Sequence, residues 1–207
     1  MTKISERGMI FNAEMVRALL DGRKTQTRRP IKWKQTRFTE IGEREDGSKW
    51  PWSEDAEHAC DFWHPCPFGA VGDRIWVREA FRVHSRATDV ATLVYKASER
   101  NSWTEQTRRV PVAVCNKPAT PEKWTPSLHM PRWASRILLE ITGVRVERLR
   151  SMSQDDARAE GVTAASGPME AGLAFRELWD SIYGEESWKA NPWVWVIEFK
   201  RVEGGAA

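Results

Sequence analysis

Residues 135–149 read SRILLEITGVRVERL, and this segment alternates between apolar and polar positions. A period of two is typical of a β-strand that buries one face. The alternation resumes after Gly143, where a bulge would bend the strand around a small barrel. The segment therefore predicts a long, bent strand with inward positions at Ile137, Leu139, Ile141, Val144 and Val146.

Shorter alternating segments predict further strands. GDRIWVREAFRV (72–83) begins with a turn signal, and the ranges 91–97 and 109–115 alternate over shorter lengths. The closing segment, 193–202, predicts a strand that places four large apolar side chains on one face, namely Trp193, Trp195, Ile197 and Phe199.

Three helices are expected alongside these strands. Asn12 can cap a helix over 13–21, which Gly22 can end. Ser153 and Asp156 have the spacing of a capping box, for a short helix that ends at Gly161. The range 168–183 has helical periodicity, and its expected buried side consists of Leu173, Phe175, Leu178, Trp179 and Ile182.

Two stretches are expected to be long inserted loops, at about 30–71 and 98–131. The first is polar and acidic, and the second is rich in proline, which cannot lie inside a sheet. A chain of 207 residues is long enough to bury one sizeable core. We therefore expect a single α+β domain over 1–207, a small mixed β-barrel flanked by helices and carrying two long inserted loops.

Composition narrows the class of protein. No apolar run approaches the ~20 residues needed to cross a bilayer, and MTKISERGMIF lacks the apolar core of a secretion signal. We therefore expect a soluble, cytoplasmic protein without a membrane partner. Its three cysteines are expected to be reduced. A net charge of +3 is too small for a dedicated DNA-coating protein.

The basic residues are unevenly distributed. The range 23–37 is rich in lysine and arginine and contains no acid, which suits a phosphate-bearing or otherwise anionic partner. A solvated loop has the same composition, so both interpretations stay open on charge alone.

Within that stretch, GRKTQTRR (22–29) places an amine, hydroxyls and guanidinium groups directly after a helix end. If the turn is helical or 3₁₀, Lys24 and Thr27 share a face; if it is extended, they point apart. A solvated basic turn is the structural alternative. Farther along, Glu160 lies at a helix end that disfavours acids, four residues after Asp156. A cation elsewhere in the fold would explain this carboxylate, and Lys24 is a candidate. An exposed glutamate that tolerates the small penalty is the alternative.

The octapeptide resembles the signature of the ASCH family, Gly-x-Lys-x-x-Glu-x-Arg. Gly22, Lys24 and Arg29 match it, and Thr27 replaces the usual glutamate. That replacement is similar to the bacterial N4-acetylcytidine amidohydrolase branch, whose turn reads Gly-Arg-Lys-Thr-x-Thr-x-Arg. GDRIWV and VIEFKRV also resemble the family, and HMPRWASRI resembles larger members carried by phages and prophages. The resemblance implies a PUA-like β-barrel and a catalytic set of Lys24, Thr27 and Glu160.

It also implies a reaction, the removal of the acyl group from N4-acylated cytosine nucleosides by a hydrolase that needs no metal or other cofactor. A lysine that burial keeps neutral can take the proton of a threonine hydroxyl. Thr27 would attack the acyl carbonyl, Lys24 would pass the proton to the departing amine, and Glu160 would orient Lys24 or activate water. The alternative is an RNA-binding or RNA-processing ASCH module without amidase activity.

Four side chains are expected to bind the substrate. Two of them are Arg28 and Arg29, and either Arg29 or backbone N–H groups could stabilise a developing oxyanion. Trp52 and Trp63 lie in the first expected loop, where they could stack on a flat pyrimidine. Packing in a core or an interface is the alternative for any single tryptophan.

The first expected loop also contains the pattern H-x-C-x₃-H-x-C. Its four potential zinc ligands are His58, Cys60, His64 and Cys66. Prolines stiffen this segment and no standard zinc module has the pattern, so the alternative is that no metal binds.

Overall fold

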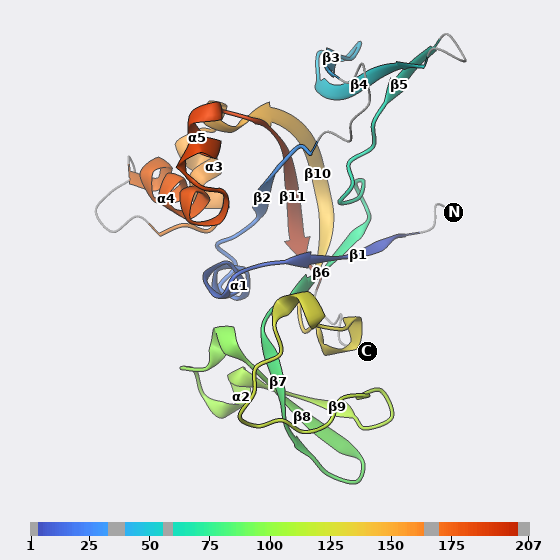
Figure 1. Cartoon of the computed structure of the whole chain (residues 1–207), viewed down its shortest axis with the longest axis vertical. Helices are drawn as coiled ribbons and strands as arrows, with labels where there is room; N and C mark the ends of the chain where they lie inside the picture. Colours follow the sequence, from blue (N-terminus) through green and yellow to red (C-terminus); the bar gives the residue numbers. More distant parts are fainter. Residues whose placement is uncertain (1–3, 33–39, 56–59, 164–169, 203–207) are drawn as a thin grey trace. The chain divides into compact units, whose positions relative to one another are not determined.

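A computed structural model describes residues 4–32, 40–55, 60–163 and 170–202 (Figure 1). The structure is a strand-rich mixture of helices and strands, so the expected α+β class is confirmed. The strands of the described residues belong to several sheets, and they do not close into the expected small barrel. None of the described helices is long and apolar enough to span a membrane.

The chain forms two compact units, each assembled from segments that are distant in the sequence. The first unit comprises Met1–Gly22, Asp73–Glu140 and Arg201–Ala207, and the second comprises Arg23–Gly72 and Ile141–Lys200. The two expected insertions therefore fall in different units.

In the first unit, β1 runs parallel to β6, the start of β10 is antiparallel to β6, and β7, β8 and β9 form an antiparallel sheet. The expected N-terminal helix is confirmed, because the Asn12 side chain accepts a hydrogen bond from the Met15 amide at 2.8 Å and Gly22 follows with a φ of 74°. The elements are β1 (Glu6–Ile10), α1 (Ala13–Leu20), β6 (Arg74–Arg78), β7 (Phe81–Arg86), β8 (Val90–Tyr95), η1 (Lys96–Ser98), α2 (Trp103–Gln106), β9 (Thr107–Pro111), η2 (Ser127–His129), η3 (Arg132–Ala134) and the first residues of β10 (Leu138–Arg148).

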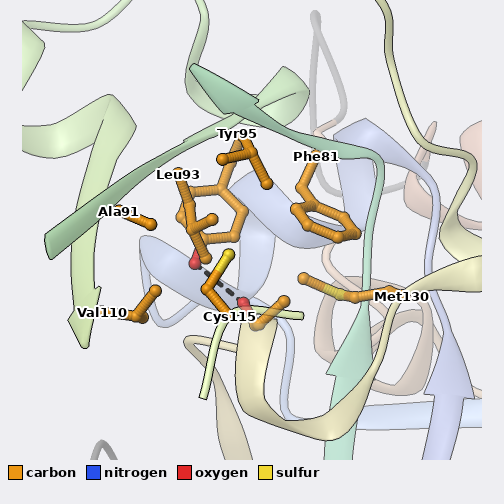
Figure 2. Close-up of a cluster of buried hydrophobic side chains, with 9 residues drawn as sticks. Phe81, Ala91, Leu93, Tyr95, Val110, Cys115 and Met130 are labelled. Atoms are coloured by element: carbon orange, nitrogen blue, oxygen red, sulfur yellow. Dashed lines mark hydrogen bonds between the residues drawn. The ribbon is translucent and has the colours of Figure 1, made fainter. Parts of the chain in front are cut away.

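A buried cluster forms the core of the first unit (Figure 2). Phe81, Leu93 and Met130 are among its apolar members, and the Tyr95 hydroxyl donates a hydrogen bond to the Ala134 carbonyl at 2.8 Å. This hydrogen bond satisfies the one polar group that Tyr95 brings into the core.

One expected strand, over 72–83, is instead two. β6 ends at Arg78 and β7 begins at Phe81, and Glu79 is buried between them. Arg136 holds its carboxylate with two hydrogen bonds, of 2.9 and 3.0 Å. A buried carboxylate needs such a partner, so Glu79 interrupts the alternation that the sequence otherwise continues.

In the second unit, β11 is antiparallel to β2, and β3, β4 and β5 form an antiparallel sheet. Its elements are β2 (Gln26–Pro30), β3 (Glu40–Glu43), β4 (Lys49–Asp55), β5 (Cys60–Trp63), the remainder of β10, η4 (Leu149–Ser151), α3 (Gln154–Ala159), α4 (Ala171–Tyr183), α5 (Glu185–Ala190) and β11 (Trp193–Arg201).

The described part of 30–71 therefore contains three strands, where the sequence predicted a loop. Trp50 and Trp52 are two residues apart on β4 and so share a face, and Trp63 on β5 lies directly opposite Trp52. Aromatic cross-strand pairs stabilise such a sheet even when its strands are short and polar. In the second expected loop, 98–131, the described structure includes α2 and β9.

The expected buried side of α4 is only partly right. Phe175 and Trp179 are buried, whereas Leu173 and Ile182 are 61% and 43% exposed. The buried stripe contains Ala171, Phe175 and Trp179, at a spacing of four residues, and it is narrower than the sequence suggested.

Candidate functional site

The second unit brings Lys24 and Glu160 together in its interior. Lys24 lies two residues before the start of β2, and Glu160 is the C-terminal cap of α3. Their backbones form an isolated antiparallel bridge, in which the Thr25 amide donates to the Ala159 carbonyl at 2.8 Å. The Lys24 Nζ donates to the Glu160 Oε2 and to the Glu160 carbonyl, each at 2.8 Å. The expected contact between this lysine and this glutamate is therefore confirmed.

Both side chains are out of contact with solvent, with exposed fractions of 0% for Lys24 and 1% for Glu160. Burial lowers the pKa of the Lys24 ammonium, because the charged form loses its hydration. The Glu160 carboxylate opposes this effect, and the charges of Arg29 and Arg28 add to it. The outcome is a lysine that releases its proton more readily than an exposed one.

Arg28 of β2 is also buried, and its guanidinium contacts the same Glu160 carboxylate as Lys24. Its Nη1 lies 3.2 Å from the Glu160 Oε1, the oxygen that Lys24 does not hold. Its Nη2 lies 3.3 Å from both the Glu147 Oε2 and the Asp156 Oδ1. Arg28 was expected to bind substrate, but these contacts engage its guanidinium with the protein's own acids.

Asp156 is fixed in place by its neighbours on α3 and β2. The expected capping box is confirmed, since the Ser153 amide and hydroxyl donate to the Asp156 Oδ2 at 2.9 and 2.8 Å. Gln26 and Arg145 donate to the Asp156 Oδ1 at 3.1 and 3.0 Å. Burial alone would raise the pKa of Asp156, but the hydrogen bonds from Ser153 and Gln26 and the charge of Arg28 hold it well below its usual range.

Thr27 lies on the other face of β2. The side chains of Gln26 and Arg28 contact Asp156 on the α3 side, and successive side chains of a strand point to opposite faces. Thr27, between them, pairs across the sheet with Ile197 and is 1% exposed. The segment is thus extended, the alternative in which Lys24 and Thr27 point apart.

Arg29 and the tryptophans lie on the Thr27 side. Arg29 is half-buried and pairs with Trp195, which shares a face with Ile197. The ring of Trp50 meets that of Trp195 edge to face, with 5.0 Å between centroids. Trp52 and Trp63 are the expected stacking residues. The register of β3, β4 and β5 places both of them on the same face as Trp50.

An arginine already stacks on this tryptophan face. The Arg44 guanidinium carbon lies 4.0 Å from the ring centroid of Trp50 and 5.3 Å from that of Trp63. Gly42 gives these rings room, since a Cβ there would come within 3.0 Å of the Trp63 ring. The tryptophans pack within the second unit and are half-buried rather than fully exposed.

The potential zinc ligands do not come together in the described part of the chain. Cys60 is exposed at the start of β5 and His64 follows its end, four residues later, so their backbones are roughly 13 Å apart in an extended strand. His64 hydrogen-bonds to Ser53 at 2.9 Å, and burial lowers its pKa. Cys66 is buried, and His58 lies outside the described residues. Among the described residues, no three His, Cys, Asp or Glu side chains form a group that could hold a metal ion.

The sequence interpretation did not include several residues of the ion network. Arg145 donates to Glu147 and to Glu198, and Gln26 reaches Asp156. The sequence pattern does indicate a charged face on this strand, because Arg145 and Glu147 alternate with Val144 and Val146 and so share one face of β10. Only the packing of β10 against its neighbours shows that this charged face is partly buried.

Comparisons with models of protein families, with curated proteins and with solved structures find no match to this chain.

Proposed function

We propose that this chain is an amidohydrolase that removes the acyl group from N4-acylated cytosine nucleosides, with Lys24 and Glu160 as its proton-transfer pair. The observation that carries the proposal is the Lys24 ammonium, which is buried, lies 2.8 Å from the Glu160 carboxylate and has a lowered pKa. Strongly perturbed titratable groups gather at sites of acid–base chemistry. The resemblance of GRKTQTRR to the amidohydrolase branch of the ASCH family supplies the substrate class.

The reaction needs a base that can also act as an acid. Neutral Lys24 takes a proton from the nucleophile, a C–O bond forms at the acyl carbon, and the bond from that carbon to the exocyclic N4 breaks. Lys24 then returns its proton to N4, which leaves as the amine of cytidine. Glu160 holds the Lys24 Nζ in place through both its carboxylate and its carbonyl. One water is consumed, and the acyl group leaves as a carboxylic acid.

Thr27 is the nucleophile that the resemblance implies. Its side chain lies on the face of β2 opposite the Lys24–Glu160 pair, so Lys24 can take its proton only after β2 changes conformation. A water molecule drawn to the Lys24 side is the simpler nucleophile for this geometry. Either nucleophile requires an opening motion, because solvent does not reach Lys24 in the structure.

Acetate release from N4-acetylcytidine tests the proposal. Lys24→Met and Glu160→Gln should each reduce kcat by about 100-fold or more, the usual contribution of general acid–base catalysis. Lys189→Met is the matched control, since Lys189 is exposed and pairs with Glu186 at the surface. Wild-type turnover in folded Lys24→Met would refute the proposal.

Thr27→Val separates the two nucleophiles. Valine has nearly the shape of threonine without the hydroxyl, and Thr27 is buried. If Thr27 is acylated, the variant loses turnover and no acyl-enzyme forms during a single turnover. If water attacks directly, turnover stays within a few fold of the wild type. N4-acylated cytidines, cytosines and deoxycytidines, assayed side by side, then define the substrate range.

The basic range 23–37 supports the RNA-binding alternative less well than its composition suggests. Lys24 and Arg28 are buried in ion pairs, and Arg23 donates to the Gly161 carbonyl at 2.7 Å. Phosphate binding depends on cations that face the nucleic acid. Salt-dependent binding of an RNA oligonucleotide without turnover of the free nucleoside would favour this alternative over the hydrolase.

A further inference from the structure

Glu160 has two carboxylate oxygens, and the structure gives each its own cation. Oε2 accepts from the Lys24 Nζ at 2.8 Å, and Oε1 accepts from the Arg28 Nη1 at 3.2 Å. All three residues are at most 3% exposed. A lysine and a glutamate buried alone would behave differently, because the loss of the lysine proton would leave a buried carboxylate without a counter-charge.

Arg28 removes that obstacle. A guanidinium does not lose its proton in a protein, so Arg28 compensates Glu160 whether Lys24 is charged or neutral. With Lys24 protonated the three groups carry a net charge of about +1, and with Lys24 neutral they carry none. The neutral state of Lys24 therefore leaves the buried cluster balanced.

We infer that Arg28 is a positioning residue that acts as the permanent counter-ion of Glu160, so that Lys24 can give up and take back its proton without leaving the Glu160 carboxylate unpaired. This inference rests on the proposed role of Lys24 as a base. It assigns Arg28 a role through Glu160 and Lys24 rather than in substrate binding.

The surroundings of Arg28 fit this role. Glu147 and Asp156 each lie 3.3 Å from its Nη2, and both are partly exposed, at 27% and 21% of their side chains. They contact Nη2, whereas the Glu160 oxygen contacts Nη1. In the described part of the chain, the charged groups near the Lys24 ammonium include Arg28 and Arg29 of β2 and Glu160 at the end of α3. Beyond Arg28 they include Asp156 of α3 and Glu147 of β10.

Arg28→Gln is the direct test, read out first without any substrate. The titration of Lys24 is followed by NMR of its side-chain ε-carbon, assigned by comparison with Lys24→Met. In Arg28→Gln the midpoint should move to higher pH, because a nearby cation is lost and Glu160 retains Lys24 as its counter-charge. Arg158→Gln is the control; its guanidinium is 46% exposed, pairs with Asp155, and should leave the midpoint in place. An unchanged midpoint in folded Arg28→Gln overturns the inference.

Kinetics provide a second readout. Arg28→Gln should lower kcat at pH 7 roughly tenfold, leave KM within about twofold, and recover activity as the pH is raised. A raised KM with an unmoved Lys24 midpoint would make Arg28 a substrate-binding residue instead. If the wild type does not hydrolyse N4-acetylcytidine, the proposed function fails, while the NMR titration still decides the role of Arg28.

Glu147→Gln keeps the inference testable if Arg28→Gln does not fold. Glu147 contacts Arg28 and Arg145, and its side chain is 27% exposed, so its loss should be tolerated. Removing this acid leaves the Arg28 charge less neutralised, so the Lys24 midpoint should move to lower pH. A midpoint that stays in place or moves upward in Glu147→Gln contradicts the inference.

Discussion

Replacing Lys24 with methionine should destabilise the protein, and the loss should grow as the pH rises. Methionine keeps most of the length of the side chain and removes its charge. The substitution deletes two hydrogen bonds of 2.8 Å to Glu160, whose carboxylate keeps Arg28 at 3.2 Å. Because Glu160 is not left as an isolated buried charge, the loss at pH 7 should be about 1.5–3 kcal/mol, the range for hydrogen bonds to charged groups.

The pH dependence follows from the lowered pKa of Lys24. In the unfolded chain the group has its ordinary value of 10.5, and in the folded chain burial lowers it. Between those two values the unfolded chain binds more protons, so the free energy of unfolding of the wild type rises with pH. The rise is at most about 1.4 kcal/mol for each pH unit in that window. Methionine contributes no such rise, so the gap between wild type and variant widens.

Urea unfolding at pH 7, 8, 9 and 10, followed by tryptophan fluorescence, measures the gap directly. Lys189→Met is the matched control, because the Lys189 ammonium is 59% exposed and forms its ion pair with Glu186 at the surface of α5. Its difference from the wild type should not widen with pH. A Lys24→Met gap that is constant or narrows between pH 7 and 10 would refute a lowered pKa for Lys24 and, with it, the case for a neutral base.

Two further substitutions test the first unit. Glu79→Gln should lower the free energy of unfolding by about 3 kcal/mol in urea, because it leaves the Arg136 guanidinium without its counter-charge, and it should not change how Lys24 titrates. Gly8→Ala should cost about 1–3 kcal/mol by the same measurement, since its Cβ would come within 2.6 Å of the Trp76 ring. In the second unit, Gly143→Ala should cost less, because its Cβ would meet only the end of the Glu198 side chain, which is 46% exposed.

The sequence was most informative where local energetics failed to explain a residue. Local energetics do not explain an acid at position 160, at the end of α3, and the distant cation that this predicts is Lys24, which contacts Glu160. The helix caps at Asn12 and Ser153 could also be predicted from the sequence, because a capping side chain forms its hydrogen bond within its own turn. Interactions that are local in sequence can be inferred without a structure. So can a distant partner, when a residue lies where its local neighbours disfavour it.

The face on which Thr27 lies could not be inferred in this way. GRKTQTRR is compatible with a turn or a strand, and its pairing with β11, about 170 residues later, selects the strand. The sheet formed by β3, β4 and β5 was missed for a related reason. Its strands are short and polar, and the pairing of Trp52 with Trp63 only becomes visible once the register is known.

Stability alone is a poor explanation for the ion network of the second unit. Replacing buried ion pairs with apolar side chains of similar volume is often neutral or stabilising, by about 1–4 kcal/mol. The first unit shows the contrast, since its buried Glu79 is held by Arg136, a cation that stays charged at any physiological pH. In the second unit Arg28 could balance Glu160 in the same way, yet a lysine is buried beside them. Burial lowers the pKa of this lysine, Lys24, so that it loses its proton more readily. An arginine in its place would stay charged and could not transfer a proton.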